Sequence, residues 1–386
     1  MQYDVAAAPG RLIEARRRPE FTSWADRVAP AAFIMPAVLT ILALSIFPLI
    51  VSVYLSLARI KFEKGGVTVT FIGLLNYKKL LFGSQQFHLI GTLMPITPLG
   101  WVFQAIVAGL LILWLVTAVR RGAGVLGLVG RLLVAVAAIA LALLFTSAGA
   151  EGGQLGTIGV TLTYVVIGVC VQYGLGLALA MLCVQNLRGR GFFRVVFFLP
   201  MMITPVGVAY TFRMLTDTTK GPFSPIWQGL GLSDFAWAAT AWGARVAVMI
   251  GDAWQWTPFM FIVLLAAIEG QPREQVEAAH VDGANHWQIF RFITWPAIMP
   301  VTITLILIRV IEAFKIVDLP NVLTNGGPGI ASESMTLHAY STWRALDIGG
   351  SAAIAYMLLF IVTFFCTAFV NLVRTRPPAR AAGAQR

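Results

Sequence analysis

The sequence has 386 residues, of which 58% are hydrophobic and 12% are charged, and it carries a formal net charge of +11. Together with a mean hydropathy of +0.80, this composition excludes an ordinary water-soluble domain, in which about a quarter of the residues are charged. The basic residues gather at the chain ends and in short connections between apolar runs, so the charge indicates membrane topology rather than nucleic-acid binding.

Eight apolar runs are long enough to cross a bilayer as helices, which takes about 20 residues each. They cover residues 31–57, 99–119, 125–147, 158–184, 192–215, 242–268, 297–319 and 350–373. An even number of spans puts both termini on one side, and the arginines of the tails, residues 1–30 and 374–386, assign that side to the cytoplasm. The predicted fold class is therefore an all-α, polytopic transmembrane bundle of about eight helices.

Several connections have features of their own. Residues 58–98 form a predicted external loop with a short amphipathic segment, and residues 99–147 form a hairpin of two helices that turns at the basic joint Arg120-Arg121-Gly122. Pro48 predicts a kink in the first span, and two prolines predict an irregular, bendable helix over 192–215. The three cysteines lie within or at the ends of apolar runs and predict no disulfide.

The connection over residues 269–300 is polar and has the pattern of two short helices. Pro272, Glu274 and Glu277 suit the beginning of the first helix. Asp282-Gly283 can supply the turn, and the second helix is expected to begin at about Asn285. The small side chains of Ala278 and Ala279 would let another surface approach closely. From these residues alone, the segment is either a helical pair that stands on the cytoplasmic face or an amphipathic helix that lies in the lipid interface.

The same segment resembles the EAA loop of ABC importer permeases. The matching residues are Glu277-Ala278-Ala279, Asp282-Gly283-Ala284, Ile293, Pro296 and Pro300. Four further phrases, in the same order, are similar to sugar-type permeases of the maltose importer class: FIGLLNYKKLL (71–81), GLGLALAML (174–182), FRVVFFLPMMITP (193–205) and VLTNGGPG (322–329). The hairpin over residues 99–147 departs from the usual arrangement of these permeases, and its role stays open.

The resemblance implies an ABC type I importer transmembrane core over residues 156–373, in a multi-pass subunit of the bacterial inner membrane. The implied partners are a second permease subunit in a heterodimer, two ATP-binding-cassette ATPases, an external solute-binding protein and membrane lipid, with no nucleic acid. The implied coupling residues, which would contact the ATPases, are Glu277, Ala278, Ala279, Asp282 and Gly283. The function implied is import of a carbohydrate or related polar solute by alternating access.

The chain is expected to be a transport subunit and not an enzyme. No Lys is followed by Ser or Thr, so it lacks the phosphate loop that binds nucleotide, and ATP and Mg are expected on the partner ATPases. The GxGxxG pattern that begins at Gly122 enters a membrane helix and follows no strand, which excludes a dinucleotide site. The four histidines are too scattered to predict a metal site.

Charged residues inside spans cost about 2.5 to 3.5 kcal/mol each, so they normally face the interior of the bundle. Arg309, Glu312, Lys315 and Asp318 recur at three-residue steps and either pair with one another or face the solute. Polar and aromatic residues also cluster around Asp252, as solute contacts or as an aromatic belt. With the positions that the resemblance adds, the predicted substrate path comprises Met201, Pro205, Tyr210, Asp252, Trp254, Trp256, Arg309, Glu312, Ala313 and Ile316. Several of these differ from the residues of a maltose site, so another cargo is expected.

Other functions remain open from the sequence. An ion-gradient-driven secondary transporter would also have buried charges, but it would show repeated halves and need no docking loop. A membrane-embedded enzyme would need a convergent catalytic set, which the sequence does not offer. Among importers, a phosphorylated polyol or a glycoside fits the residues as well as a free sugar does.

Overall fold

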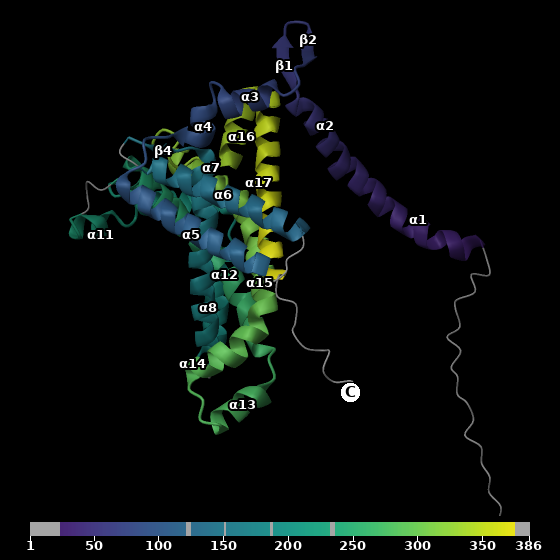
Figure 1. Cartoon of the computed structure of the whole chain (residues 1–386). Coiled ribbons are helices and arrows are strands. Elements are labelled where there is room, and N and C mark those ends of the chain that lie inside the picture. Colours follow the sequence, from purple (N-terminus) through teal and green to yellow (C-terminus); the bar gives the residue numbers. More distant parts are fainter. Residues whose placement is uncertain (1–23, 121–124, 150–151, 186–187, 232–235, 375–386) are drawn as a thin grey trace, which may run out of the picture. The chain divides into compact units, whose positions relative to one another are not determined.

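The computed structural model describes residues 24–120, 125–149, 152–185, 188–231 and 236–374 (Figure 1). The chain divides into two compact units, Met1–Tyr54 and Leu55–Arg386. Within the described ranges, 7 helices are long and apolar enough to cross a membrane, or up to 8 if one bent pair forms a single span. The predicted polytopic helical class is confirmed. Residues 1–23 and 375–386 of the predicted tails lie outside the described residues.

The first apolar run begins as α1 (Trp24–Ile41), continues through the π-helical turn η1 (Leu42–Ile46) and ends as α2 (Phe47–Ser56). Proline has no N–H to donate to the preceding turn, and Pro48 lies two residues after the end of η1. The predicted irregularity near Pro48 therefore takes the form of a widened π turn.

The predicted external loop contains a β-hairpin that the helical pattern did not predict. Strand β1 (Ala58–Glu63) pairs antiparallel with β2 (Gly66–Phe71), so that Ala58 lies opposite Phe71. Alternating Val and Thr in β2 favour a strand, and Gly66 supplies the positive φ of the turn. Helices α3 (Leu75–Phe82) and α4 (Gln86–Ile90) follow, and the Asn76 amide on α3 donates to the carbonyl oxygen of Ala58 at 3.1 Å.

The hairpin of residues 99–147 consists of α5 (Pro98–Arg120) and α6 (Val125–Ala148). The Gln104 side chain donates to the Thr146 hydroxyl at 3.0 Å and joins the two helices. At the end of the hairpin, β3 (Gly91–Thr92) pairs with β4 (Gln154–Leu155). The tip of the predicted basic joint, residues 121–124, lies outside the described residues.

The centre of the second unit is a bundle around α12 (Ala241–Glu269), the most buried of the candidate spans. Its closest neighbour is the span formed by α7 (Thr157–Thr163), the π turn η2 (Tyr164–Gly168) and α8 (Val169–Val184). A Cβ added to Gly176 on α8 would lie 2.5 Å from the Met260 Cβ on α12, so these helices meet at a glycine. Phe261, Leu264 and Leu305 form the buried apolar core of this bundle.

The run over residues 192–215 is not a single helix. It divides into α9 (Arg190–Phe198), the 3-10 turn η3 (Leu199–Met202) and α10 (Pro205–Thr216), which are bent by 98°. Pro200 and Pro205 interrupt the backbone ladder, and the Thr204 hydroxyl caps α10 by accepting from the Gly207 N–H at 3.3 Å. The short α11 (Ser224–Gly229) and η4 (Trp237–Ala239) lead on to α12.

The last third of the chain begins with α13 (Arg273–Val281) and α14 (His286–Ile289). The π turn η5 (Phe290–Thr294) joins α14 to α15 (Trp295–Phe314), so this span covers His286–Phe314 instead of the predicted 297–319. The span ends early because the Thr336 hydroxyl donates to the carbonyl of Phe314 at 3.0 Å. Then follow η6 (Pro320–Thr324), α16 (Met335–Arg344) and α17 (Ile348–Arg374).

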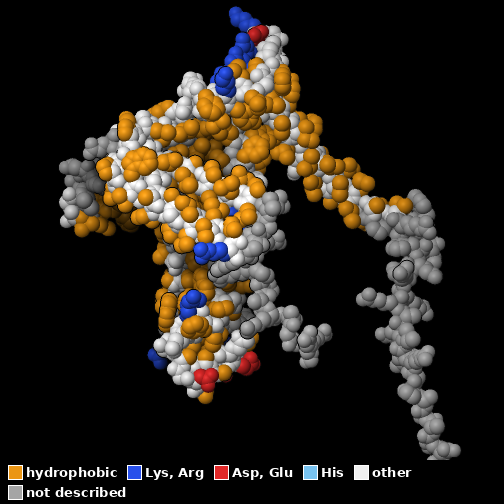
Figure 2. Space-filling view, in the orientation of Figure 1, with side chains coloured by type: hydrophobic (Ala, Val, Ile, Leu, Met, Phe, Trp, Pro, Cys, Tyr) orange, Lys and Arg blue, Asp and Glu red, His pale blue; other side chains and the backbone are white. Residues whose placement is uncertain are grey.

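The polar elements of the second unit lie at its two ends. Helices α3, α4 and α16 lie at one end and α13 and α14 at the other (Figure 1). On the face drawn in Figure 2, hydrophobic side chains cover most of the sides of the helices, and the acidic side chains are confined to the ends. This distribution is the one that a bilayer requires.

A histidine cluster joins α4 to α16 at the first of these ends. The rings of His88 and His338 stack with their centroids 3.9 Å apart, and His88 Nε2 lies 2.5 Å from a carboxylate oxygen of Glu333. Glu333 also accepts from the Ser341 hydroxyl at 3.3 Å. Burial, and then the neighbouring His88, lower the pKa of His338 from 6.5 to about 4, so this ring is neutral near pH 7.

We expect acid to destabilise the protein through His338. Between pH 6.5 and about 4 the unfolded chain protonates this residue while the folded chain does not, so stability falls as pH falls, by roughly 3 kcal/mol over the whole window. Thermal denaturation in detergent from pH 7 to 4.5 measures the effect, and His338→Gln should flatten the pH dependence. His280→Gln on exposed α13 is the matched control; equal slopes in both variants would contradict the assignment.

Candidate functional site

Three polar side chains from three helices meet in the apolar core. Gln172 on α8, Asp252 on α12 and Arg309 on α15 are 0%, 5% and 1% exposed. The Arg309 guanidinium forms an ion pair with Asp252 and donates from Nε to the Gln172 carbonyl oxygen at 2.7 Å. The Gln172 amide donates to the same Asp252 oxygen at 2.7 Å. The three side chains thus form a closed triangle that joins α8, α12 and α15.

The ion pair and hydrogen bonds of the triangle offset the free-energy cost of burying its two charges. A buried carboxylate or guanidinium loses several kcal/mol of hydration, which only a well-formed pair with further hydrogen bonds offsets. Arg309 gains an additional contact because its Cζ lies 4.7 Å from the centre of the Trp256 ring, within the range of a cation–π interaction. Trp256 is on α12, one turn after Asp252, so both contacts bind α15 to α12.

A cavity of about 240 Å³ lies beside this triangle. The side chains around it supply carboxylates, an ammonium group, an amide and an aromatic ring. The lining residues are Pro205, Asp252, Gln255, Trp256, Glu312, Lys315, Ile316, Val317, Asp318 and Leu319. The Gln255 amide donates to the carbonyl of Ile203 at 3.2 Å, which holds the break between η3 and α10 against α12.

The structure gathers half of the predicted substrate path at this cavity. Pro205, Asp252, Trp256, Glu312 and Ile316 line it, and Arg309 lies behind Asp252. Met201, Tyr210, Trp254 and Ala313 are not among the lining residues. Trp254 contacts Phe212 edge to face with the ring centroids 5.6 Å apart, about 200° around α12 from Trp256. Ala313 packs in the apolar core.

The charges at three-residue steps divide between two roles. Lys315 pairs with Glu312 at 2.6 Å at the cavity, as mutual neutralisation predicts, whereas Arg309 pairs with Asp252 on another helix. The pattern does not continue as one face because α15 ends at Phe314. Sequence reasoning missed Gln172 as a site residue, although it is the one Asn or Gln within the apolar run of residues 158–184.

The second candidate site is the polar helix pair α13 and α14 at the opposite end from α16. Gly283 has φ +80 and turns the chain between the helices, and Asn285 caps α14 in a reciprocal capping box with Gln288, both bonds at 2.8 Å. The helix–turn–helix predicted from the sequence is therefore present. Of its predicted coupling residues, Glu277, Ala278, Asp282 and Gly283 are exposed, and Ala279 is partly buried.

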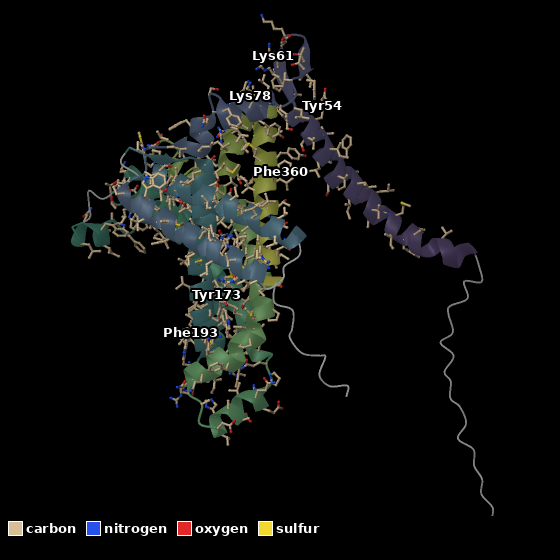
Figure 3. All side chains as sticks on the ribbon, viewed as in Figure 1. Tyr54, Lys61, Lys78, Tyr173, Phe193 and Phe360 are labelled. Carbon is tan, nitrogen blue, oxygen red and sulfur yellow. The ribbon has the colours of Figure 1, made fainter. Side chains whose placement is uncertain are left out.

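Side-chain contacts fasten the base of this helix pair to the bundle. Arg194 on α9 forms an ion pair with Glu269 at the end of α12 and donates to the carbonyl of Cys183 on α8 at 3.3 Å. Gln271 donates to the Thr294 hydroxyl at 3.4 Å and connects the two ends of the polar segment. Further along α8, the Tyr173 hydroxyl lies 3.2 Å from that of Thr302 on α15 (Figure 3).

The sequence is similar to a family of membrane transport proteins. Residues 172–376 match the family described as "Binding-protein-dependent transport system inner membrane component". The trehalose/maltose transport system permease protein MalF of Thermococcus litoralis is 33% identical over 217 residues, which are 56% of this chain and 74% of that protein. The trehalose transport system permease protein SugA of Mycobacterium tuberculosis is 28% identical over 221 residues, covering 57% and 70%.

Among solved structures, the chain is similar in fold to one from a bacterial ABC transporter involved in the import of the acidic polysaccharide alginate. The TM-score is 0.62 at 17% identity, and the match covers 91% of this chain and 97% of that chain.

Removing one partner of the buried ion pair should be strongly destabilising. We expect Arg309→Met to cost about 3 to 5 kcal/mol because it leaves Asp252 buried without its counter-charge, whereas combining it with Asp252→Leu and Gln172→Leu, which removes all three polar groups, should recover most of the loss. Thermal denaturation in detergent measures both. Glu312→Gln is the control, since it breaks a partly exposed pair worth at most about 1 kcal/mol. Similar losses for Arg309→Met and Glu312→Gln would rule out a dominant role for the buried pair.

Proposed function

Because this chain belongs to the family of binding-protein-dependent transport system inner membrane components, we propose that it is the permease subunit that passes a neutral carbohydrate through its cavity and is driven by separate ATPases docked on α13 and α14. It is a multi-pass membrane protein of the ABC importer type. Beyond the family, we propose a coupling site, a path for the solute, a class of cargo and the partner subunits.

The observation that carries the coupling role is the apolar surface on a polar helix pair. Val281, Trp287 and Phe292 are 88%, 69% and 73% exposed, beside the exposed charges of Glu277 and Asp282. Large hydrophobic side chains that project from a polar segment at the end of a membrane bundle fit a protein–protein contact. We assign this contact to an ATP-binding-cassette ATPase because the sequence of the segment resembles an EAA loop.

A rigid connection links the docking site to the cavity. Helix α12 runs about 25 Å from Glu269, at the base of the helix pair, to Asp252 at about 1.5 Å per residue. The chain from Thr294, the last residue of η5, along α15 to Arg309 covers a similar distance. The two helices are joined near one end by Gln271 and Thr294 and at the cavity by the ion pair. A push on α13 is therefore delivered to residues that line the cavity, as alternating access requires.

The charge at the cavity favours a neutral solute. Arg309 neutralises Asp252 and Lys315 neutralises Glu312, so the carboxylate of Asp318 is left in excess at the lining. An excess carboxylate repels phosphate and uronate groups, whereas carboxylates, amides and an indole ring suit sugar hydroxyls and the apolar face of a sugar ring. The names of the relatives, with trehalose or maltose as cargo, support the same class.

The small volume of the cavity favours a solute path that is shared with a partner subunit. At about 240 Å³ it is below the range of about 300 to 1,000 Å³ for drug-sized ligand sites. We propose that a second permease subunit supplies the other half of the path and that an external solute-binding protein delivers the sugar. In this arrangement α13, α14 and both termini lie on the cytoplasmic side of the inner membrane, and ATP and Mg bind only to the ATPases.

The turn between α13 and α14 offers a direct test of coupling. A Cβ at Gly283 would meet no atom within 4 Å, so Gly283→Val acts through its positive φ alone, which costs an L-residue about 1 to 2 kcal/mol. We expect the altered turn to lower ATP-driven uptake in proteoliposomes about tenfold. Gly283→Asn, which tolerates this φ, should retain uptake, and so should Gly231→Val, which introduces the same strain elsewhere (φ +70). Full uptake by Gly283→Val would refute the docking role.

The cavity offers a test of the cargo. Glu312→Gln should lower binding-protein-dependent uptake of radiolabelled trehalose or maltose about tenfold, since a hydrogen bond to a charged group is worth about 1.5 to 3 kcal/mol. Glu63→Gln, which removes an exposed carboxylate from β1, should leave uptake unchanged. Excess unlabelled sugar should compete, whereas glycerol phosphate should not. Competition by glycerol phosphate, or unaltered uptake by Glu312→Gln, would exclude the proposed contact.

A further inference from the structure

A groove away from the transport cavity lies between the hairpin and the last helix. It has a volume of about 580 Å³ and is lined by residues of α5, α6 and α17. Nearly all of its lining is apolar or glycine, including Trp114, Ala138 and Phe365. The exceptions are Arg131 on α6 and Asn371 on α17.

Arg131 has an unsatisfied hydrogen-bonding group. Its Nη1 atom is buried and has no hydrogen-bond partner among the residues that the structure describes. The guanidinium Cζ lies 5.9 Å from the centre of the Trp114 ring, at the outer limit of a cation–π contact. Arg309, the buried arginine of the cavity, is by contrast paired with both Asp252 and Gln172.

None of the three helices that line the groove has an Asp or Glu in its sequence. The sequence has no Asp or Glu between Glu63 and Glu151, which includes all of α5 and α6, and none after Asp347, which includes all of α17. Arg131 is a partly buried cation whose Nη1 atom is buried without an acceptor, which is costly, so an anion from outside the chain would stabilise the site.

Arg131 lies near the first end of α6. It lies about 9 Å along the axis from Val125, the first residue of α6, at about 1.5 Å per residue. An arginine near the end of a membrane helix can reach the headgroup region with its long side chain. Gly127 and Gly130 lie on the stretch between, where an added Cβ would meet no atom within 4 Å.

We propose that this groove is a binding site for one anionic phospholipid, with its phosphate on the Arg131 guanidinium and an acyl chain along Ala138 and Phe365. A phosphate accepts two charge-assisted hydrogen bonds from a guanidinium. An anionic lipid is favoured over phosphatidylcholine because the choline ammonium of the latter offsets the charge of its phosphate. The apolar lining excludes a free, fully hydrated anion. The site rests on the hairpin and α17 and does not depend on the proposed cargo or on ATP coupling.

Native mass spectrometry of the full-length chain, purified alone and with its copurifying subunits, tests the site. We expect one phosphatidylglycerol to be retained about tenfold more tightly than phosphatidylcholine. Arg131→Gln should abolish this preference and Arg131→Lys should keep part of it. Arg120→Gln, which removes an arginine from the same end of the hairpin, should keep it fully. Ala138→Phe, which fills the groove, should weaken the binding of both lipids.

The other outcomes would overturn the proposal. Equal phosphatidylglycerol binding by the unaltered chain and Arg131→Gln would remove Arg131 from the site. Saturation by glycerol phosphate, with no effect of Ala138→Phe, would mean a simple anion site. Loss of lipid binding when the partner subunits are present would mean that a protein surface covers the groove. Thermal denaturation of Arg131→Lys, which keeps the charge, separates lost binding from lost folding.

Discussion

The buried triangle of Gln172, Asp252 and Arg309 is the interaction on which the arrangement of the second unit depends. Three helices contribute one polar group each to an apolar interior, where none of these groups is stable without the other two. Sliding α12 or α15 by a turn would leave a charge unpaired, and sliding α8 would leave the Gln172 amide unpaired, so the triangle fixes the relative positions of the three helices. Such a constraint contributes specificity of arrangement more than stability, because a well-packed apolar triple could be as stable.

The break between α9 and α10 is held against α12 beside the cavity. Two prolines free backbone carbonyls inside an apolar bundle, which is tolerated only where they find donors or face a cavity. The Ile203 carbonyl receives the Gln255 amide, and Pro205 lines the cavity. The irregular backbone, the ion pair and the cavity are therefore parts of one polar region at the centre of the bundle.

The hairpin of α5 and α6 is the part that the family resemblance explains least. Its helices are apolar on nearly all sides, and the family match begins only at residue 172. The single charge within the hairpin helices, apart from Arg120 at their joint, is Arg131, and the groove beside it is lined jointly with α17. The shared groove places the hairpin beside α17, the last helix of the segment that matches the family.

The sequence by itself determined the helical class, the positions of nearly all the spans and the helix pair around Gly283, because length, apolar composition, caps and a positive-φ glycine act locally. It also selected Asp252 and Arg309, since charge inside an apolar run is conspicuous. It did not give their pairing, the part that Gln172 plays or the 98° bend between η3 and α10. Only the tertiary structure decided these, because which helix faces which, and which polar group finds a partner, depends on contacts between residues far apart in the chain.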